Sequence, residues 1–115
     1  MSWEILFFES GRDEKPVEIF IDSLDIDTEA KVFRMVYTLL HQYGPSLTMP
    51  HSKKITDNLY ELRIRGKVEI RIFYTFKDKA IYLLHAFQKK SQKIPSRELD
   101  IAKKRLAYYH RPWLV

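Results

Sequence analysis

Two runs of alternating apolar and polar residues, at positions 59–65 and 68–76, flank Gly66. Alternation with period two is typical of strands with one buried face, and two such runs around a short turn predict an antiparallel hairpin. The apolar side chains expected to share the core face are Leu62, Ile64, Ile70 and Ile72. The opposite face is expected to be polar and open, and to carry Glu61, Arg63, Arg65, Glu69 and Arg71 together with Phe73.

The remaining periodic stretches complete an α+β chain of four strands and three helices. Helical spacing of apolar residues after Pro16 and again before Gly44 predicts two helices, and their short connection predicts that they lie antiparallel. The expected order is a strand (3–8), a helix opening at Pro16, a longer helix ending at Gly44 and Pro45, a loop (46–54), three strands (59–65, 68–76, 80–87) and a helix opening at Pro95. At 115 residues, the chain 1–115 is expected to form a single domain.

Charge is divided unevenly along the chain. Residues 1–50 carry 4 Lys and Arg against 9 Asp and Glu, whereas residues 51–115 carry 16 against 6. A basic second half attracts polyanions such as nucleic acid, or an acidic protein segment, if it folds onto one surface. The alternative is a solvated basic face without a partner.

Several chemistries are disfavoured by what the sequence lacks. There is no Cys, and the four His residues share no metal-ligand spacing, so we expect no metal site and no cofactor. Asp25, Asp27 and Glu29 have the spacing of a calcium loop, but Ala30 and Val36 replace its glycine and its last glutamate. No apolar run has the roughly 20 residues of a membrane span, and residues 1–10 do not resemble a signal peptide, so a soluble cytoplasmic protein is expected.

The predicted polar face suits RNA. Guanidinium groups clamp phosphates and stack on bases, so Arg63, Arg65 and Arg71 beside Phe73 are candidate RNA contacts. The alternative is a ladder of Glu–Arg ion pairs across the strands. If the face is open, Arg71→Ala should change the free energy of unfolding by less than about 1 kcal/mol.

The end of the last predicted strand offers further candidates. Lys89 and Lys90 could reach over the rim of the same sheet, or they could form an ordinary solvated turn. His85 could act as a general acid or base because imidazole titrates near neutrality. Between Leu84 and Ala86 it could equally be a half-buried structural side chain.

Three segments together resemble the phage-derived HigB-like branch of the RelE/ParE superfamily of type II toxins. They are Leu59-Tyr60-Glu61-Leu62-Arg63, Arg71-Ile72-Phe73-Tyr74, and the run from Leu83 to Lys90 followed by Pro95 and the terminal helix. The resemblance implies two helices packed on a twisted, mainly antiparallel sheet. It also implies ribosome-dependent cleavage of mRNA on the 70S ribosome, and a cognate antitoxin, in this branch commonly a helix-turn-helix protein.

Carried over by position, the resemblance gives Arg63, Arg71 and Lys90 the task of holding charge on the phosphate. Where many relatives have Arg, this chain has Lys90, which lacks the planar fork. His85 or a lysine of depressed pKa would move the proton as a 2′-hydroxyl attacks the adjacent phosphate. The expected catalytic residues are thus Arg63, Arg71, His85 and Lys90, and the expected RNA-binding residues are Lys53, Lys54, Arg65, Phe73 and Lys89. Two alternatives stay open: a ParE-type inhibitor of DNA gyrase, and a binding module without toxicity.

Overall fold

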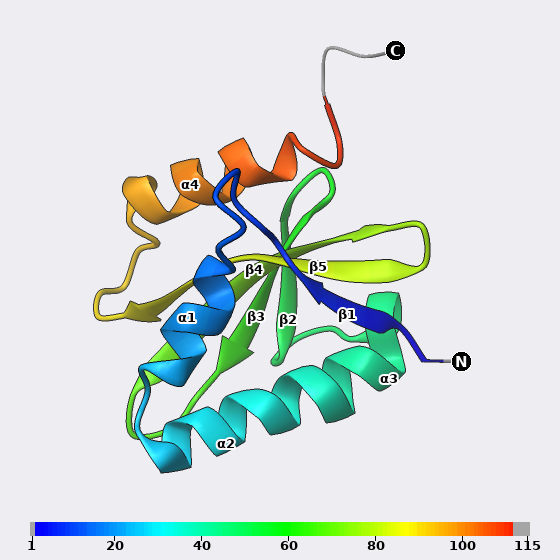
Figure 1. The fold of residues 1–115 in the computed structure, drawn as a ribbon. Coiled ribbons are helices and arrows are strands. Elements are labelled where there is room, and N and C mark those ends of the chain that lie inside the picture. Colours follow the sequence, from blue (N-terminus) through cyan, green and yellow to red (C-terminus); the bar gives the residue numbers. More distant parts are fainter. Residues whose placement is uncertain (1, 112–115) are drawn as a thin grey trace.

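The computed structural model describes residues 2–111 as a twisted five-stranded sheet with helices on both sides (Figure 1). The strands lie in the order β1-β5-β4-β3-β2. Along the chain the elements are β1 (Glu4–Phe7), α1 (Pro16–Asp22), α2 (Ile26–Arg34), η1 (Met35–Leu40), α3 (His41–Tyr43), η2 (Gly44–Ser46), β2 (Ser52–Thr56), β3 (Leu59–Ile64), β4 (Glu69–Lys77), β5 (Ala80–Lys89) and α4 (Ser96–Leu106). The predicted α+β class is confirmed.

The sheet has one strand more than expected. Residues 52–54, predicted as the end of a loop, belong with residues 55 and 56 to β2, which pairs antiparallel with β3. Its sequence, Ser-Lys-Lys-Ile-Thr, lacks apolar alternation because β2 is an edge strand with two exposed lysines. One polar side chain of β2 does face the core, where the Ser52 hydroxyl bonds the Tyr74 hydroxyl. β1 adds to the opposite edge, parallel to β5.

The predicted hairpin is confirmed, with Leu62 opposite Ile72 and Ile64 opposite Ile70. These four side chains lie in one buried cluster with residues of α1, α2 and η1, so that the helices cover the predicted face. α2 runs back from the Ser23–Asp25 connection in roughly the opposite direction to α1 (Figure 1).

The long helix predicted to end at Gly44 is continuous, but its second half, η1, is a π-helix. Along α2 and η1 together, the buried residues Val32, Val36 and Leu40 recur every four positions, which exceeds the 3.6-residue α-helical turn. A wider π turn keeps all three on the core side. The helix stops at Gly44, whose positive φ of 49° and close approach to the Trp3 indole both require glycine.

A second cluster occupies the other face of the sheet. Ala102 and Leu106 of α4 pack there on apolar side chains of the strands, which are Leu59, Phe73, Leu84 and Phe87. Figure 1 shows α4 on the side of the sheet away from α2. The expectation of an open polar face is therefore wrong, because α4 covers part of it. Within residues 2–111, no helix is long and apolar enough to cross a membrane.

Candidate functional site

An ion-pair network crosses β3 and β4 on the face that α4 partly covers. Arg63 and Arg71 are directly opposite each other in the strand register. The Nε of Arg63 donates to Oε1 of Glu61 at 3.1 Å, and a terminal nitrogen of Arg71 donates to the same oxygen at 2.9 Å. Glu61 is fully buried and Arg71 is 3% exposed, whereas the Arg63 side chain keeps 15% exposure. The two arginines are thus unequal, and Arg63 is the one that reaches solvent.

The network continues to the end of β5. Arg71 also donates to Glu69, and Lys89 lies 3.9 Å from the same Glu69 oxygen. Burial acts to raise the pKa of Glu69, but the hydrogen bond from Arg71 and the charges of Arg71, Lys89 and Arg65 outweigh it and hold the pKa below its ordinary value. The alternative of Glu–Arg ion pairs is therefore present in part, because the Arg71–Glu61 pair crosses from β4 to β3 while the other two pairs stay within one strand. These pairs bring Arg63, Arg71 and Lys89 into one cluster.

Two atoms of this network are buried without a hydrogen-bond partner among the described residues: Oε2 of Glu61 and Nε of Arg71. Such groups are costly to leave unsatisfied in a protein interior. The network is therefore largely buried and incompletely paired.

Phe73 does not have the exposed ring expected of a base-stacking residue. It is fully buried and stacks on Phe87, with ring centroids 5.7 Å apart. It belongs to the apolar cluster under α4, so it supports the sheet and presents no face to a ligand.

His85 links β5 to α4. Its Nε2 lies 2.7 Å from a Glu98 oxygen, and a terminal nitrogen of Arg105 lies 3.3 Å from its Nδ1. A guanidinium can only donate, so Nδ1 accepts and Nε2 carries the proton that bonds Glu98. Burial lowers the pKa of His85, with a smaller contribution from the Arg105 charge, while the hydrogen bond to Glu98 opposes the shift. Both ring nitrogens of this neutral imidazole therefore have a side-chain partner, as expected if His85 is a half-buried structural residue.

Glu98 and Arg105, which complete this arrangement, were missed by reasoning from the sequence. They lie seven residues apart, four before and three after Ala102, which α4 buries against the sheet. Residues at such spacing share a helix face, so the pair flanks the apolar stripe of α4. Arg105 also donates to the Leu84 carbonyl at 2.8 Å, which fixes α4 on β5.

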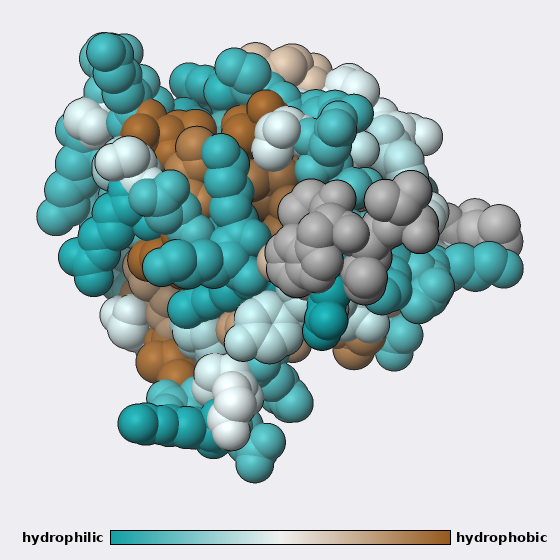
Figure 2. All heavy atoms as spheres, turned by 90° about the horizontal axis from the view of Figure 1, so that it is seen from above, coloured by the Kyte–Doolittle hydropathy of each residue, from teal (hydrophilic) through white to brown (hydrophobic). Residues whose placement is uncertain are grey.

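The structure separates the two lysines of the predicted basic loop. Lys53 is opposite Glu61 and therefore shares the face of Arg63, whereas Lys54 is opposite Tyr60 and points to the helix side. Arg65 and Lys90 are exposed just beyond β3 and β5. Seen from the α4 side, the surface is mostly hydrophilic with an apolar patch between hydrophilic side chains (Figure 2). Arg63 and Lys89 are thus accompanied on this side by Lys53, while Lys54 is not part of the cluster.

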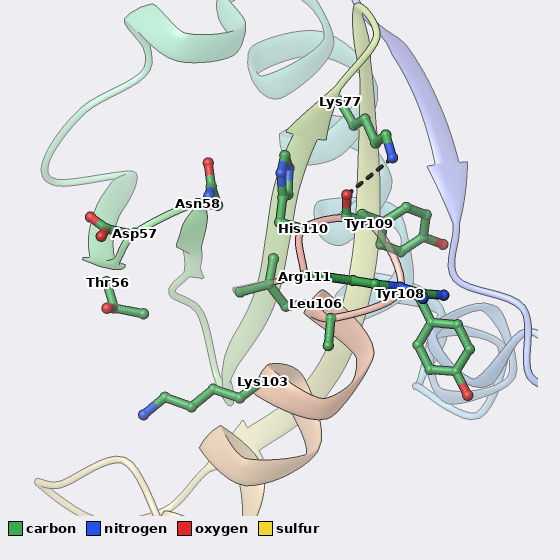
Figure 3. Close-up of a pocket in the computed structure, with 11 residues that line it drawn as sticks. Thr56, Asp57, Asn58, Lys77, Lys103, Leu106, Tyr108, Tyr109, His110 and Arg111 are labelled. Carbon is green, nitrogen blue, oxygen red and sulfur yellow. Dashed lines mark hydrogen bonds between the residues drawn. The ribbon is translucent and has the colours of Figure 1, made fainter. Parts of the chain in front are cut away.

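A separate groove of 1020 Å³ lies between the β2–β3 turn and the end of α4 (Figure 3). Thr56, Asp57 and Asn58 line one side and Lys103 the other. Lys77 donates to the Tyr109 carbonyl at 3.0 Å, which ties the chain after α4 to β4. None of the predicted catalytic or RNA-binding residues lines this groove. Residues 2–111 contain no group of three or more His, Asp or Glu residues placed to hold a metal ion.

Comparison with known protein families matches residues 19–107 to the family described as phage derived protein Gp49-like. The match spans most of the chain, from α1 through α4. A search of curated proteins gives no match.

Proposed function

Because the chain belongs to the Gp49-like family of phage-derived proteins, a family of RelE- and HigB-type toxins, we propose that it is a ribosome-dependent endoribonuclease toxin of the HigB-like branch. In this proposal it cuts mRNA on the 70S ribosome in the cytoplasm. A helix-turn-helix antitoxin encoded beside it holds it inactive.

The observation that carries the proposal is the position of Arg63. Its Nε is fixed by buried Glu61, and its terminal nitrogens have no partner among the described residues. A cation held in place before substrate arrives loses little energy in reorganisation, and this is how proteins stabilise charge that develops in a transition state. Lys53 on the same face and Lys89 and Lys90 at the end of β5 supply further positive charge for RNA phosphates.

The reaction proposed is attack of an RNA 2′-hydroxyl oxygen on the adjacent phosphorus. The bond from phosphorus to the 5′ oxygen breaks, leaving a 2′,3′-cyclic phosphate and a 5′-hydroxyl, and the proton lost from the 2′ oxygen is balanced by one gained at the 5′ oxygen. Arg63 and Lys90 would hold the additional negative charge on the phosphate oxygens. Because protein cations carry that charge, cleavage should continue in a chelator as long as the ribosomes stay intact.

Arg71 and His85 take positioning roles in this proposal. Arg71 is buried between Glu61 and Glu69, so it acts through the carboxylate that orients Arg63. Both ring nitrogens of His85 bond side chains of α4, Glu98 and Arg105, so His85 acts by holding α4 in place on β5. Phe73 and Lys54 are assigned no contact with RNA.

The test is to map RNA ends after a short pulse of expression and to repeat cleavage with purified ribosomes. Arg63→Ala is compared with Arg34→Ala, which removes an exposed guanidinium from α2 on the other side of the sheet. Cut transcripts that depend on Arg63 and not on Arg34 support the proposal. Intact transcripts with DNA damage would point to gyrase inhibition, and growth without either effect would point to a binding module.

A further inference from the structure

A small groove separates α1 from the α2–η1 helix on the side of the sheet away from α4. Its volume is 120 Å³, and it is lined by Phe7, Glu18, Ile21, Asp22, Phe33 and Tyr37. Pockets for small-molecule ligands usually measure about 300–1,000 Å³. This groove therefore has room for a single side chain of another molecule.

One wall of the groove is acidic. Glu18 and Asp22 are four residues apart on α1, so their carboxylates lie on the same helix face. Neither forms an ion pair within residues 2–111, and no Lys or Arg lines the groove. Like charges at this spacing disfavour a helix, and no Lys or Arg of the described residues forms an ion pair with either carboxylate.

The other wall is aromatic and exposed. Phe33 and Tyr37 are also four residues apart, with ring centroids 5.9 Å from each other and exposures of 38% and 43%. Burial raises the pKa of Tyr37, and the charge of Glu18 adds to this, so the acidic and aromatic walls are close enough to interact. Ile19, the residue after Glu18 on α1, is a further exposed apolar side chain of that helix.

Aromatic faces next to unpaired carboxylates are the chemistry that binds a guanidinium or ammonium group. The electron-rich face of an aromatic ring attracts a cation, and a planar guanidinium can stack on the ring while it donates hydrogen bonds to a carboxylate. RNA and anionic lipid would be repelled, because residues 1–50, which supply this groove, carry 9 acidic and 4 basic side chains. The complementary occupant is an amphipathic protein segment with a basic anchor.

We propose that the Glu18–Asp22 and Phe33–Tyr37 groove is the docking site of the antitoxin, which inserts an arginine or lysine flanked by apolar side chains. The inference rests on the toxin assignment of the proposed function, because it takes the antitoxin as the partner. Since Arg63 lies on the opposite face of the sheet, this contact leaves the RNA-facing cations uncovered. The antitoxin would then bind the toxin at a surface that takes no part in cleavage.

The experiment measures binding of the full chain, made by cell-free synthesis, to the purified protein encoded beside it. Asp22→Lys reverses a charge at the C-terminal end of α1, where a lysine suits the helix dipole, so the helix itself should not be weakened. Phe33→Ala removes half of the aromatic wall. Each should weaken binding about 30-fold, as expected for a residue central to an interface.

Two controls match these variants outside the groove. Glu4→Lys makes the same change of charge at an exposed position of β1, and Ile26→Ala removes an exposed apolar side chain at the start of α2. Both should bind as the parent chain does. Equal binding by all variants, or no binding by the parent chain, overturns the proposal. Concentration-dependent self-association that Asp22→Lys abolishes would also overturn it, because the occupant of the groove would then be a second copy of the chain.

Cleavage measured on the same samples keeps the two proposals apart. Asp22→Lys should cut RNA at the parent rate while it escapes the antitoxin. If no variant and no parent chain cuts RNA, the nuclease proposal fails, and the binding comparison still decides the docking site.

Discussion

Arg63 and Arg71 lie opposite each other on β3 and β4 and donate to the same oxygen, Oε1 of Glu61, at 3.1 and 2.9 Å. Two like charges directly across a strand pair repel each other, so the buried carboxylate between them is what allows the pair. The arrangement makes Glu61 the structural centre of the cationic cluster, although it carries the opposite charge.

Removing that carboxylate should therefore cost stability. Glu61→Gln leaves Arg71 buried and both guanidiniums without their shared counter-charge, and breaking a buried ion pair in this way costs about 3–5 kcal/mol. Urea unfolding of the parent and the variant measures the loss. Glu4→Gln, which neutralises an exposed glutamate of β1, is the control and should stay within about 0.5 kcal/mol of the parent. A Glu61→Gln protein as stable as the control would show that the arginines tolerate each other without it.

The two arginines should separate stability from activity. Arg63→Ala leaves Glu61 paired with Arg71, so we expect a loss of about 1 kcal/mol in stability and of about 10² to 10³ in the cleavage rate. Arg71→Ala strips Glu61 and Glu69 of their buried partner, and we expect a loss of about 3–5 kcal/mol in stability. Single-turnover cleavage and urea unfolding on both variants provide the measurement. Parent-like stability of Arg71→Ala would contradict the buried network.

That expectation reverses the one drawn from the sequence, and the reason is physical. Alternation placed Glu61, Arg63 and Arg71 on one face of the hairpin, because strand periodicity is a local property. Whether that face is open depends on where α4 packs. The stripe of α4 residues around Ala102 showed that the helix buries one side, but a stripe does not say against which surface.

The same distinction explains the other differences. Phe73 was expected to be exposed because strand alternation puts it on the same face as Arg63 and Arg71, yet the ring lies under α4 with Phe87. The first three residues of β2 were predicted as the end of a loop because an edge strand with exposed lysines has no apolar alternation. His85 could be placed at the end of the last strand, but its partners Glu98 and Arg105 come from a helix more than ten residues away. Long-range pairings of this kind have no local signature.

Gly44 offers a test of how the long helix is joined to β1. A Cβ at this position would lie 2.8 Å from Cε2 of the Trp3 indole, and the φ of 49° is strained for any residue with a side chain. Gly44→Ala should lower the free energy of unfolding by about 1–3 kcal/mol. Gly11→Ala is the matched control, because nothing lies within 4 Å of its added Cβ, and it should be neutral or slightly stabilising. Similar melting temperatures for the two variants would contradict the packing of Trp3 on Gly44.

His85 should make stability depend on pH in a predictable direction. Burial lowers its pKa in the folded protein below 6.5, so below that pH the unfolded chain binds the proton more readily. The stability that neutral His85 provides is complete above about pH 6.5 and is lost as the pH falls toward the folded-state pKa, at no more than about 1.4 kcal/mol per pH unit. Protonation would also place an N–H of the ring against the Arg105 guanidinium, 3.3 Å away.

The comparison that isolates this effect is urea unfolding of the parent and of His85→Gln at pH 7.5, 6.5 and 5.5. Glutamine does not titrate, so the stability advantage of the parent over His85→Gln should shrink as the pH is lowered. His51→Gln, which removes an imidazole that makes no side-chain hydrogen bond within residues 2–111, controls for the loss of a histidine elsewhere. If the stability advantage of the parent grows on acidification, His85 is charged in the folded protein, because Glu98 then affects its pKa more than burial does. If the advantage stays constant, the proton affinity of His85 does not change on folding.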